Sequence, residues 1–425
     1  MKSVKYLLIG AGLASQRAAA KIRERDAAGS ILMVGREGHL PYDHPPLSKD
    51  YMQGKTPVEK VFLQPREFYQ ERAIELALGQ TVDQLDAAGK TAALSGEAGG
   101  SPGGARPGET VRFEKALIAT GGRPIPLDVP GATLPGVHYL RTLDDAEAIS
   151  REASPGRRCV IVGGGFIGLE LACSLTQRGV TVTLLERGER IWRRFADERL
   201  SAHIEDHCTA RGVTILKNER VVRFGGNGRV SSAVTASGRE LPCDFVCAAI
   251  GVLPNVELAR RAGLEMDNGI VVNDRLQTSN PDIYAAGDVV NFPDPHAGRR
   301  RRVEHWGGAD YGGGLAGGNM AGGSRSYDIL TYVWSDLFDL HLEFAGDESP
   351  PEKIVVRGGF SDKSFAMLYL TAGRLAAYYA VNYKRKQYLP LQKLITSRLD
   401  LAGREAQLQD PAFDVSTLLA PEPPK

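Results

Sequence analysis

The apolar positions of this chain twice follow one order: a short apolar run, a glycine-rich turn, a helix and a second apolar run. In the middle of the chain, an apolar run leads into the turn Gly-Gly-Gly-Phe-Ile-Gly at 163–168. Ile167, Leu171 and Leu175 then recur every four residues, which indicates one apolar face of an α-helix. The alternating run 181–185 predicts the strand that follows.

The start of the chain repeats this order. Residues 4–9 predict a strand, 10–15 a glycine turn, 15–25 a helix and 31–34 a second strand. Ser15 replaces the third glycine of the turn, and its small side chain makes the replacement tolerable. Two such units predict two dinucleotide sites, which indicates a flavoprotein served by a nicotinamide nucleotide.

The residues of the second turn have the chemistry that a dinucleotide needs. Gly163 and Gly165 let the backbone turn sharply and approach a pyrophosphate, and Gly168 lets the helix lie close to the strand. Glu186 ends the second strand, where a carboxylate can hold ribose hydroxyls. A purely structural glycine turn is the alternative, but strand, turn, helix and acid all occur at the expected spacing.

Each unit also ends in a similar way. The buried strand 115–120 leads into a glycine turn, and 243–251 is its counterpart in the second unit. A strand over 276–285 leads into Gly287 and Asp288, and we expect this Asp to accept a hydrogen bond from a ribityl hydroxyl.

The remaining segments predict connections and a further domain. We expect a helix over 68–76, a hairpin over 78–94 with a glycine-rich tip at 96–108, and a helix opening near Ser48. Beyond a Gly/Ser linker at 322–326, short alternating strands and a helix at 388–398 predict a small α+β domain.

The predicted fold is therefore α/β, with two Rossmann-like dinucleotide-binding domains and a small α+β C-terminal domain. The length of 425 residues agrees with several domains. We place the FAD-binding domain at 1–123 and 256–325, the NAD-binding domain at 124–255 and the C-terminal domain at 326–425.

Composition removes several classes of function. The net charge of +1 gives no reason to expect nucleic-acid or membrane binding, and the apolar run 245–253 is too short to span a bilayer. No His/Cys cluster has metal-site spacing, and Cys243 and Cys247 lie in an apolar run where we expect buried thiols. Residues 1–20 superficially resemble a signal peptide, but cleavage would destroy the first glycine turn, so we expect a cytoplasmic protein.

The order of motifs resembles the pyridine-nucleotide-dependent FAD reductases of glutathione-reductase-like fold. Gly-Ala-Gly at 10–12, the segment 41–49, Ala-Thr-Gly-Gly-Arg-Pro at 119–124, 163–170 and Ala-Gly-Asp at 286–288 carry the resemblance over essentially the whole chain. They are most similar to the branch without a redox disulfide, which includes ferredoxin reductases and apoptosis-inducing factor. The disulfide branch has a cysteine pair where this chain has Pro-Pro-Leu-Ser at 45–48, and His44 stands where the family usually has Arg.

The resemblance implies hydride transfer from NADH to FAD. It places Lys49 in an ion pair with Glu170, and Trp306 stacked near the flavin or the nicotinamide; a solvated acid and an ordinary core indole are the alternatives. Lys49, Glu170 and Trp306 are the candidate catalytic residues, and no metal is expected. The candidate cofactor-binding residues are Gly10, Gly12, Ala14, Ser15, Glu37, Lys49, Val82, Ala119, Thr120, Gly121, Arg123, Gly163, Gly165, Phe166, Ile167, Gly168, Glu170, Glu186, Arg187, Ile250, Gly251, Gly287, Asp288, Glu304, His305 and Trp306.

Three functions remain open at this point. The first is an NADH-dependent reductase of a ferredoxin or Rieske-type iron–sulfur protein, as a monomer or homodimer. The second is the same chemistry with a small acceptor such as a quinone, a monodehydroascorbate-like radical or oxygen, and the third is a slow redox-sensing protein. We expect NADH to be preferred over NADPH because Glu186 repels a 2′-phosphate, although Arg187 and Arg190 lie nearby. The basic run 299–302 is a candidate docking patch, with a solvated loop as its alternative.

Overall fold

The computed structural model describes residues 1–96, 108–193 and 195–419. The chain forms two units, each assembled from separate stretches. Unit 1 comprises Met1–Asp43, Glu59–Arg123 and Pro254–Val333, and unit 2 comprises His44–Val58, Pro124–Leu253 and Trp334–Lys425. The strands β7 (Gly122–Pro124) and β16 (Val252–Pro254) lie where the chain passes from one unit to the other. The three-domain division expected from the sequence stays a prediction.

Unit 1 contains a parallel sheet with its first strand in the middle. The strand order is β3 (Ile74–Leu78), β2 (Ile31–Gly35), β1 (Lys2–Ile9), β6 (Thr110–Ile118) and β18 (Ile283–Ala285). Two antiparallel strands, β4 (Gln80–Asp86) and β5 (Thr91–Gly96), extend from β6. A small separate sheet consists of β17 (Ile270–Val271), β19 (Val290–Asp294) and β20 (Arg299–Arg301). The helices are α2 (Arg66–Glu71), α6 (Glu257–Arg261) and the pair α1 (Leu13–Arg25) and α7 (Trp306–Met320), and a 3-10 turn spans Val58–Lys60.

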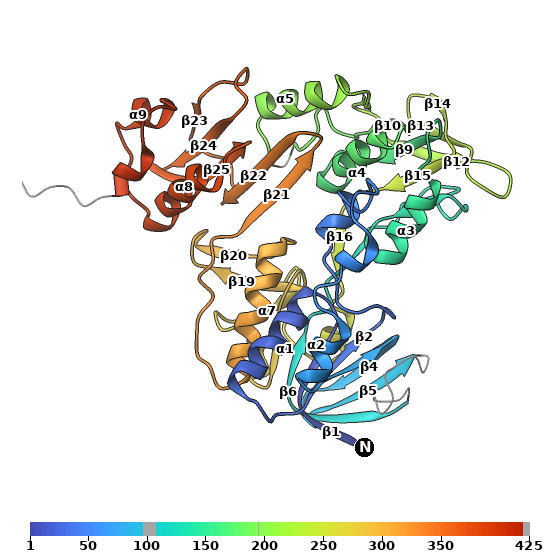
Figure 1. Cartoon of the computed structure of the whole chain (residues 1–425), viewed down its shortest axis with the longest axis vertical. Coiled ribbons are helices and arrows are strands. Elements are labelled where there is room, and N and C mark those ends of the chain that lie inside the picture. The colour runs from blue at the N-terminus through green and yellow to red at the C-terminus, as the bar shows by residue number, and fades with distance from the viewer. Residues whose placement is uncertain (97–107, 194, 420–425) are drawn as a thin grey trace, which may run out of the picture. The chain divides into compact units, whose positions relative to one another are not determined.

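Helices α1 and α7 lie side by side in unit 1 (Figure 1). A Cβ added at Gly313 would lie 2.2 Å from the carbonyl oxygen of Ala14, and one at Gly317 would lie 2.4 Å from that of Ala18. The glycines of α7 therefore let the two backbones approach each other directly. This close packing explains why a helix tolerates so many glycines, which cost helix stability elsewhere.

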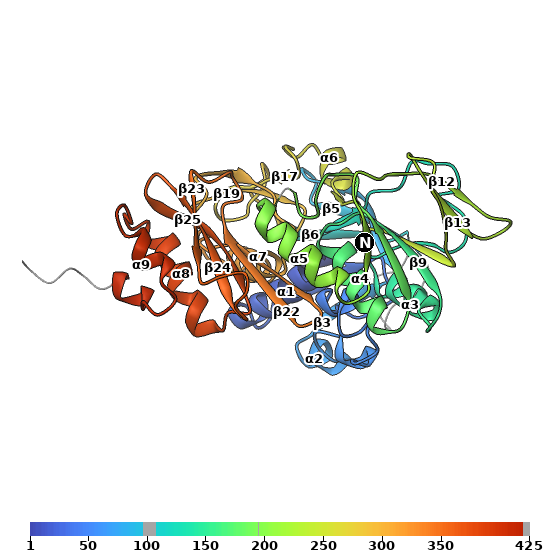
Figure 2. The same ribbon diagram turned by 90° about the horizontal axis from the view of Figure 1, so that it is seen from above.

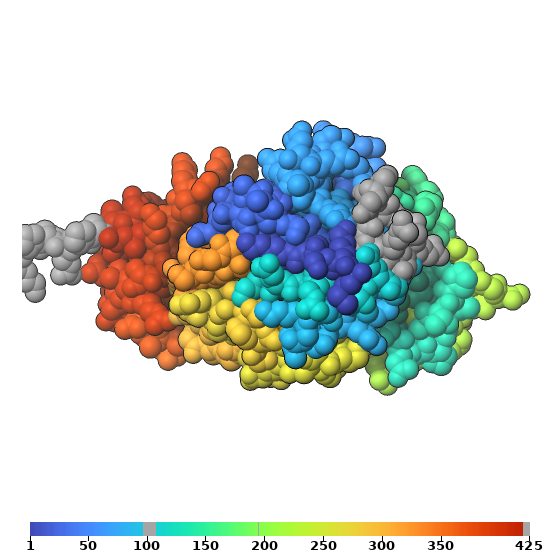
Figure 3. Space-filling model, turned by 90° about the horizontal axis from the view of Figure 1, so that it is seen from below, coloured from blue at the N-terminus to red at the C-terminus, as the bar shows by residue number. Residues whose placement is uncertain are grey.

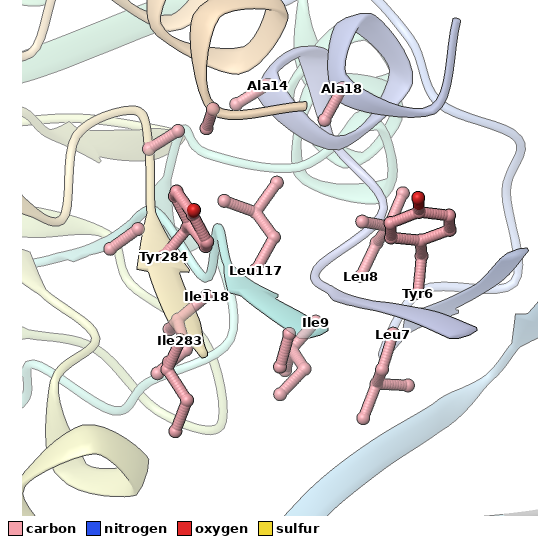
Figure 4. Close-up of a cluster of buried hydrophobic side chains, with 14 of the residues drawn as sticks. Tyr6, Leu7, Leu8, Ile9, Ala14, Ala18, Leu117, Ile118, Ile283 and Tyr284 are labelled. Atoms are coloured by element: carbon pink, nitrogen blue, oxygen red, sulfur yellow. The ribbon is translucent and has the colours of Figure 1, made fainter. Parts of the chain in front are cut away.

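The core of unit 1 includes residues on both faces of the sheet, and α1 and α7 pack on one of these faces. Leu7, Leu8, Leu117 and Ile118 are completely buried, and Figure 4 shows their side chains together with Ala14 and Ala18 of α1. Figure 3 shows the segment that contains α6 against the segment that contains β4, and Arg261 there donates to the carbonyl oxygen of Asp83 at 2.9 Å.

Four parallel strands of unit 2 repeat the order of β3, β2, β1 and β6 in unit 1. The parallel sheet of unit 2 runs β11 (Thr214–Leu216), β10 (Thr181–Leu185), β9 (Arg158–Val162), β15 (Phe245–Ala248) and β8 (Val137–Tyr139). An antiparallel meander of β12 (Val221–Gly225), β13 (Ser232–Thr235) and β14 (Glu240–Pro242) accompanies it, as β4 and β5 accompany the first sheet. The helices are α3 (Leu143–Glu152), α4 (Phe166–Gln177) and α5 (Glu198–Thr209), and Pro45–Ser48 forms a 3-10 turn. The predicted internal repeat is confirmed.

The C-terminal part of unit 2 is the predicted small α+β domain. Its sheet runs β21 (Tyr332–Leu337), β22 (Leu340–Gly346), β25 (Arg374–Val381), β24 (Phe365–Thr371) and β23 (Lys353–Arg357). Helix α8 (Arg385–Ser397) packs on β25 and α9 (Glu405–Gln409) packs on β23; both helices are visible in Figure 2. A 3-10 turn at Val415–Leu419 ends the described chain.

Three predictions of local structure need correction. The helix expected over 68–76 stops at Glu71, because Ile74, Leu76 and Leu78 belong to the parallel edge strand β3. The strand expected over 276–285 is confined to Ile283–Ala285, and the segment opened near Ser48 is only a 3-10 turn. The hairpin was expected over 78–94 and is formed by β4 and β5, and residues 97–107 of its expected tip lie outside the described residues.

Among residues 1–96, 108–193 and 195–419, no helix is long and apolar enough to cross a membrane. The same residues hold no cluster of His, Cys, Asp or Glu arranged for a metal ion. All five cysteines are buried and free, including Cys243 and Cys247 as expected.

Candidate functional site

Two helices begin at glycine turns and have no side-chain cap. The N-caps of α1 and α4 are Gly12 and Gly165, and neither helix has an acidic residue in its first turn. By contrast, the Thr142 side chain caps α3 and the Asp197 side chain caps α5. The first amides of α1 and α4 are therefore free of a side-chain acceptor, and their positive dipole ends favour an anion.

The first glycine of each turn is required by the neighbouring strand end. Gly10 has φ +108° and Gly163 has φ +111°, conformations that residues with a Cβ rarely adopt. An added Cβ would lie 2.2 Å from the carbonyl oxygen of Ala119 in unit 1 and 2.4 Å from that of Ala249 in unit 2. The predicted equivalence of the two turns therefore extends to these contacts.

The second glycine of each turn faces open space, as a pyrophosphate site requires. A Cβ at Gly12 or Gly165 would meet no atom of the described residues within 4 Å. At the third position, a Cβ on Gly168 would lie 1.9 Å from the carbonyl oxygen of Gly163. Ser15 takes this position in unit 1, and its fully buried hydroxyl has no hydrogen-bond partner among the residues that the structure describes. These features fit a pyrophosphate at both turns.

The segment after β6 is fixed by Asn255. The Thr120 hydroxyl donates to the Asn255 carbonyl oxygen at 2.7 Å, and the Asn255 side chain donates to the Thr120 carbonyl oxygen at 2.8 Å. The carbonyl oxygen of Gly121 accepts from the Asn255 amide at 2.9 Å. The Arg123 guanidinium contacts Asn255 and forms a 2.8 Å ion pair with Glu257.

Other predicted residues of unit 1 lie around its glycine turn. The Tyr42 hydroxyl donates to the Glu37 carboxylate at 2.6 Å. Ala14 is buried, and a Cβ at Gly287 would lie 3.5 Å from that of Ala14. Val82 is buried in β4.

The residues from Asp288 to Trp306 have defined partners as well. Arg302 donates to the Asp288 carbonyl oxygen at 3.2 Å and pairs with Glu304 at 2.6 Å. His305 is the N-cap of α7, and the indole N–H of Trp306 donates to Asp43 at 2.5 Å. That hydrogen bond holds the indole in one orientation.

Glu186 lies at the glycine turn of unit 2, as expected. Its two carboxylate oxygens accept from the backbone amides of Gly164 at 2.9 Å and Gly188 at 2.7 Å. Arg187 is exposed, whereas Arg190 donates to the carbonyl oxygens of Arg193 and Ala196. The carboxylate is thereby fixed at the mouth of the turn.

Large apolar side chains are exposed beside this turn. Ile167 and Ile250 are 40% and 39% exposed, unusually high values for isoleucine in this chain. Phe166 packs on Trp192 with ring centroids 4.4 Å apart. Gly251, with φ +118°, follows Ile250. This apolar surface suits the planar ring of a nucleotide.

The Glu170 carboxylate is the most buried charged group of the candidate catalytic set. It lies on α4, one turn after Phe166, and it is 3% exposed. Lys49 approaches it with Nζ 2.7 Å from Oε1, and the lysine side chain is 13% exposed. The predicted ion pair is present, and both partners belong to unit 2.

The lowered pKa values of two histidines predict that the protein is less stable in acid. Burial lowers the pKa of His305 from its usual 6.5 to about 4, with Arg301 adding to the effect, and burial with Arg141 lowers the pKa of His44 to about 3. Below pH ~6.5 these histidines bind protons in the unfolded chain but stay neutral in the folded chain. The free energy of unfolding should therefore fall from pH ~6.5 towards pH 4. Thermal unfolding between pH 7.5 and 4.5 measures this loss. His305→Asn and His44→Asn should each flatten the decline, and curves parallel to wild type would contradict the assignment.

Several contacts of the site had no signal in the sequence. Asp43 and Trp306 are far apart in the chain, and so are Ser335 and Glu170, which are 2.7 Å apart. Asn255 follows the Gly-Val-Leu-Pro segment of the repeat, so its position was visible but its role was not. Trp192 lies in the loop after β10.

The basic run 299–302 is mostly engaged within unit 1. Arg301 is 5% exposed and forms a 2.7 Å ion pair with the buried Asp294. Arg300 donates to the carbonyl oxygens of Val272 and Asn291, both at 2.6 Å. Arg302 pairs with Glu304, whereas Arg299 and Arg300 are exposed, so the docking role of the run stays a prediction.

Two parallel sheets, each with an open glycine turn at an uncapped helix, define a protein with two dinucleotide sites. The family model described as pyridine nucleotide-disulphide oxidoreductase matches residues 4–313, and the model described as reductase C-terminal matches residues 332–419. The chain belongs to the pyridine nucleotide-disulphide oxidoreductase family, which confirms the resemblance found in the sequence.

Individual relatives match over nearly the whole chain. The ferredoxin–NAD⁺ reductase component of the anthranilate 1,2-dioxygenase system of Burkholderia cepacia is 33% identical and covers 99% of this chain and 100% of its own. Putidaredoxin reductase of Pseudomonas putida is 32% identical over 92% of each chain. The crystal structure of the covalent putidaredoxin reductase–putidaredoxin complex matches with a TM-score of 0.91 at 31% identity over 99% of each chain. A ferredoxin reductase for the CYP199A2 system from Rhodopseudomonas palustris matches with a TM-score of 0.90 at 31% identity, over 99% of this chain and 100% of its own.

Proposed function

We propose that this protein is an FAD-dependent NADH oxidoreductase that reduces a ferredoxin or Rieske-type iron–sulfur protein. The observation that carries the proposal is the pair of open, uncapped glycine turns, one in each unit. The relatives support the acceptor, because the Burkholderia cepacia relative is named as a ferredoxin–NAD⁺ reductase and the Pseudomonas putida relative as putidaredoxin reductase.

The residues of unit 1 would hold FAD. The amides at the start of α1 would receive its pyrophosphate. Gly12 would leave room, and Ser15 would offer a buried hydroxyl that has no partner in the described part of the chain. We assign Glu37 to the adenosine ribose and Asp288 to the ribityl chain, following the sequence. The chemistry supplied by bound FAD is acceptance of a hydride from NADH and release of the electrons to an acceptor.

The residues of unit 2 would bind and orient NADH. The start of α4 would receive the NADH pyrophosphate, and Glu186 would accept from the ribose hydroxyls. The apolar side chains of Ile167 and Ile250 would exclude water from one side of the nicotinamide. Glu170 lies one turn further along α4 and pairs with Lys49, which follows the 3-10 turn Pro45–Ser48, and their fixed charges would orient the reacting ring.

The direct test measures cofactor, donor and acceptor separately. The purified protein should be yellow with one non-covalent FAD per chain, and NADH should bleach the flavin without oxygen. A panel of a ferredoxin, a Rieske-type ferredoxin, a quinone and oxygen should give the fastest steady-state turnover with an iron–sulfur protein. Protein that cannot be reconstituted with FAD would refute the flavoprotein assignment. Turnover near one per second or below with every acceptor would instead favour a redox-sensing protein.

The preference for NADH over NADPH is a separate prediction. The Glu186 carboxylate is held by two backbone amides, so it cannot readily turn away from a 2′-phosphate. Glu186→Ala should raise kcat/KM for NADPH by about tenfold or more while lowering it for NADH. Steady-state kinetics with both nucleotides decides the matter. Equal use of NADPH by the wild-type protein, or no gain in the variant, would count against Glu186 as the discriminating residue.

We also propose that the protein acts in the cytoplasm. Residues 2–9 form β1, the middle strand of the unit 1 sheet, and residues 13–25 form α1. Removal of these residues as an export signal would take away the centre of the sheet and the first glycine turn. Cell fractionation with an antibody against the C-terminal domain tests this location.

A further inference from the structure

Within the described residues, the Glu170 carboxylate has three side-chain partners, and one of them comes from the C-terminal domain. Oε1 contacts Lys49 Nζ and accepts from the Ser335 hydroxyl, both at 2.7 Å. Oε2 accepts from the Ser48 hydroxyl at 2.5 Å. Both carboxylate oxygens are therefore fixed, and the oxygen that contacts the ammonium group is the one that Ser335 binds.

Ser335 is placed for this contact and for no other that the described residues show. It lies in β21 and is completely buried. The next residue, Asp336, lies on the opposite face of the strand and pairs with His341 of β22 at 2.6 Å. A buried hydroxyl without a hydrogen-bond partner lowers the stability of the folded state, and an alanine at this position would avoid that cost. The hydroxyl is thus explained by the carboxylate it binds.

The bond also has a direct effect on the lysine. A carboxylate held only by Ser48 and Lys49 can rotate about its last side-chain bond, and the flexible lysine would follow it. A donor on Oε1 removes that freedom, because rotation would break two hydrogen bonds to hydroxyls at once. Hydrogen bonds to ionised groups are roughly twice as strong as neutral ones, so the restraint is substantial.

We propose that Ser335 is a positioning residue that fixes the Lys49–Glu170 pair for hydride transfer. The C-terminal domain would then contribute to the NADH half-reaction through β21. This inference rests on the proposed function, since it assumes that the pair acts on the nicotinamide.

The test combines Ser335→Ala, Glu170→Gln and the double variant in the FAD-loaded, full-length protein. Stopped-flow reduction by NADH gives the limiting rate and the Kd of NADH separately. Ser335→Ala should lower the limiting rate by about tenfold while the Kd changes by less than about twofold, because positioning affects the reaction more than binding. In the Glu170→Gln background, Ser335→Ala should lower the limiting rate only about threefold, because a hydrogen bond from Ser335 to a neutral amide is about half as strong as one to a carboxylate.

Ser174→Ala is the matched control. Ser174 is buried on α4, as Glu170 is. Its hydroxyl donates to the Ser48 carbonyl oxygen at 2.7 Å and accepts from the Gln53 side chain at 3.1 Å, so the variant loses buried hydroxyl hydrogen bonds without removing a donor to Glu170. Its limiting rate should stay within about twofold of wild type. Urea unfolding of the four cycle members provides a readout independent of turnover, and Ser335 and Glu170 should show non-additive stabilities.

The possible results distinguish the proposed reductase function from the positioning role of Ser335. Failure of the wild-type protein to bind FAD or to accept electrons from NADH would refute the proposed function, whatever Ser335 does. Normal reduction of wild type with an unchanged limiting rate in Ser335→Ala would overturn the positioning role alone. Equal losses in both Glu170 backgrounds, or an equal loss in Ser174→Ala, would also overturn it.

Discussion

Replacing Lys49 with alanine should destabilise the protein and slow its reduction by NADH together. Glu170 is 3% exposed, so removal of the ammonium group leaves a carboxylate in a poorly hydrated site. Breaking one side of a buried ion pair costs about 3–5 kcal/mol, and we expect a loss of unfolding free energy of that order. Without the lysine, the Glu170 carboxylate is no longer held in place near the glycine turn at 163–168, and this change should slow flavin reduction on the order of 100-fold. Urea unfolding and anaerobic stopped-flow absorbance measure the two effects.

Lys55→Ala is the control for this prediction. Lys55 is exposed, lies in the same segment of unit 2 and reaches the side chain of Gln177 on the same helix at 3.4 Å. Its loss should change stability by less than about 0.5 kcal/mol and leave the reduction rate unaltered. If Lys49→Ala behaved like Lys55→Ala, the buried pair would have no part in the reaction.

Gly168→Ala should abolish tight NADH binding while FAD stays bound. The new Cβ would lie 1.9 Å from the Gly163 carbonyl oxygen, which is backbone and cannot swing aside. Helix α4 must then move away from the turn, and overpacking of this kind costs about 1–3 kcal/mol. We expect the Kd of NADH to rise on the order of 30-fold, the equivalent of about 2 kcal/mol. Titration with NADH measures the Kd, and the flavin absorbance per chain reports the retained FAD.

Gly165→Ala, in the same turn, separates packing from access. Its Cβ would meet no atom within 4 Å, and its φ of −83° is open to alanine. The variant should unfold at the wild-type temperature but bind NADH more weakly, because the methyl group occupies the space open to a pyrophosphate. Equal losses of thermal stability in both variants would contradict the distinct roles of the two glycines.

Local chemistry accounts for what was predictable from the sequence. Gly10 and Gly163 need positive φ angles, and Gly168 needs the absence of a Cβ, so these positions carry a visible residue type. The repeated strand order follows from the same pattern, because parallel strands buried on both faces are nearly continuous apolar runs. Helix α4 was visible through the spacing of Ile167, Leu171 and Leu175.

Long-range pairing explains where local pattern misled. The segment from Phe68 to Leu76 has a composition compatible with a helix, yet Ile74 and Leu76 pair with Ile31 and Met33 of β2. Pairing of this kind overrides local propensity, and nothing between residues 68 and 76 reveals it.

The sequence by itself determined the α/β class, the two glycine turns and the acid at the end of β10, because each depends on residues that are neighbours in the chain. The ion pair of Lys49 and Glu170 was available only through resemblance to a family, since its partners are far apart in sequence. The tertiary structure alone decided that Ser335 completes that pair, that Asp43 orients Trp306 and that Arg301 is buried against Asp294. A hydroxyl, a carboxylate or a guanidinium has no local signature of its partner, because the partner is brought to it only when the sheets and helices pack.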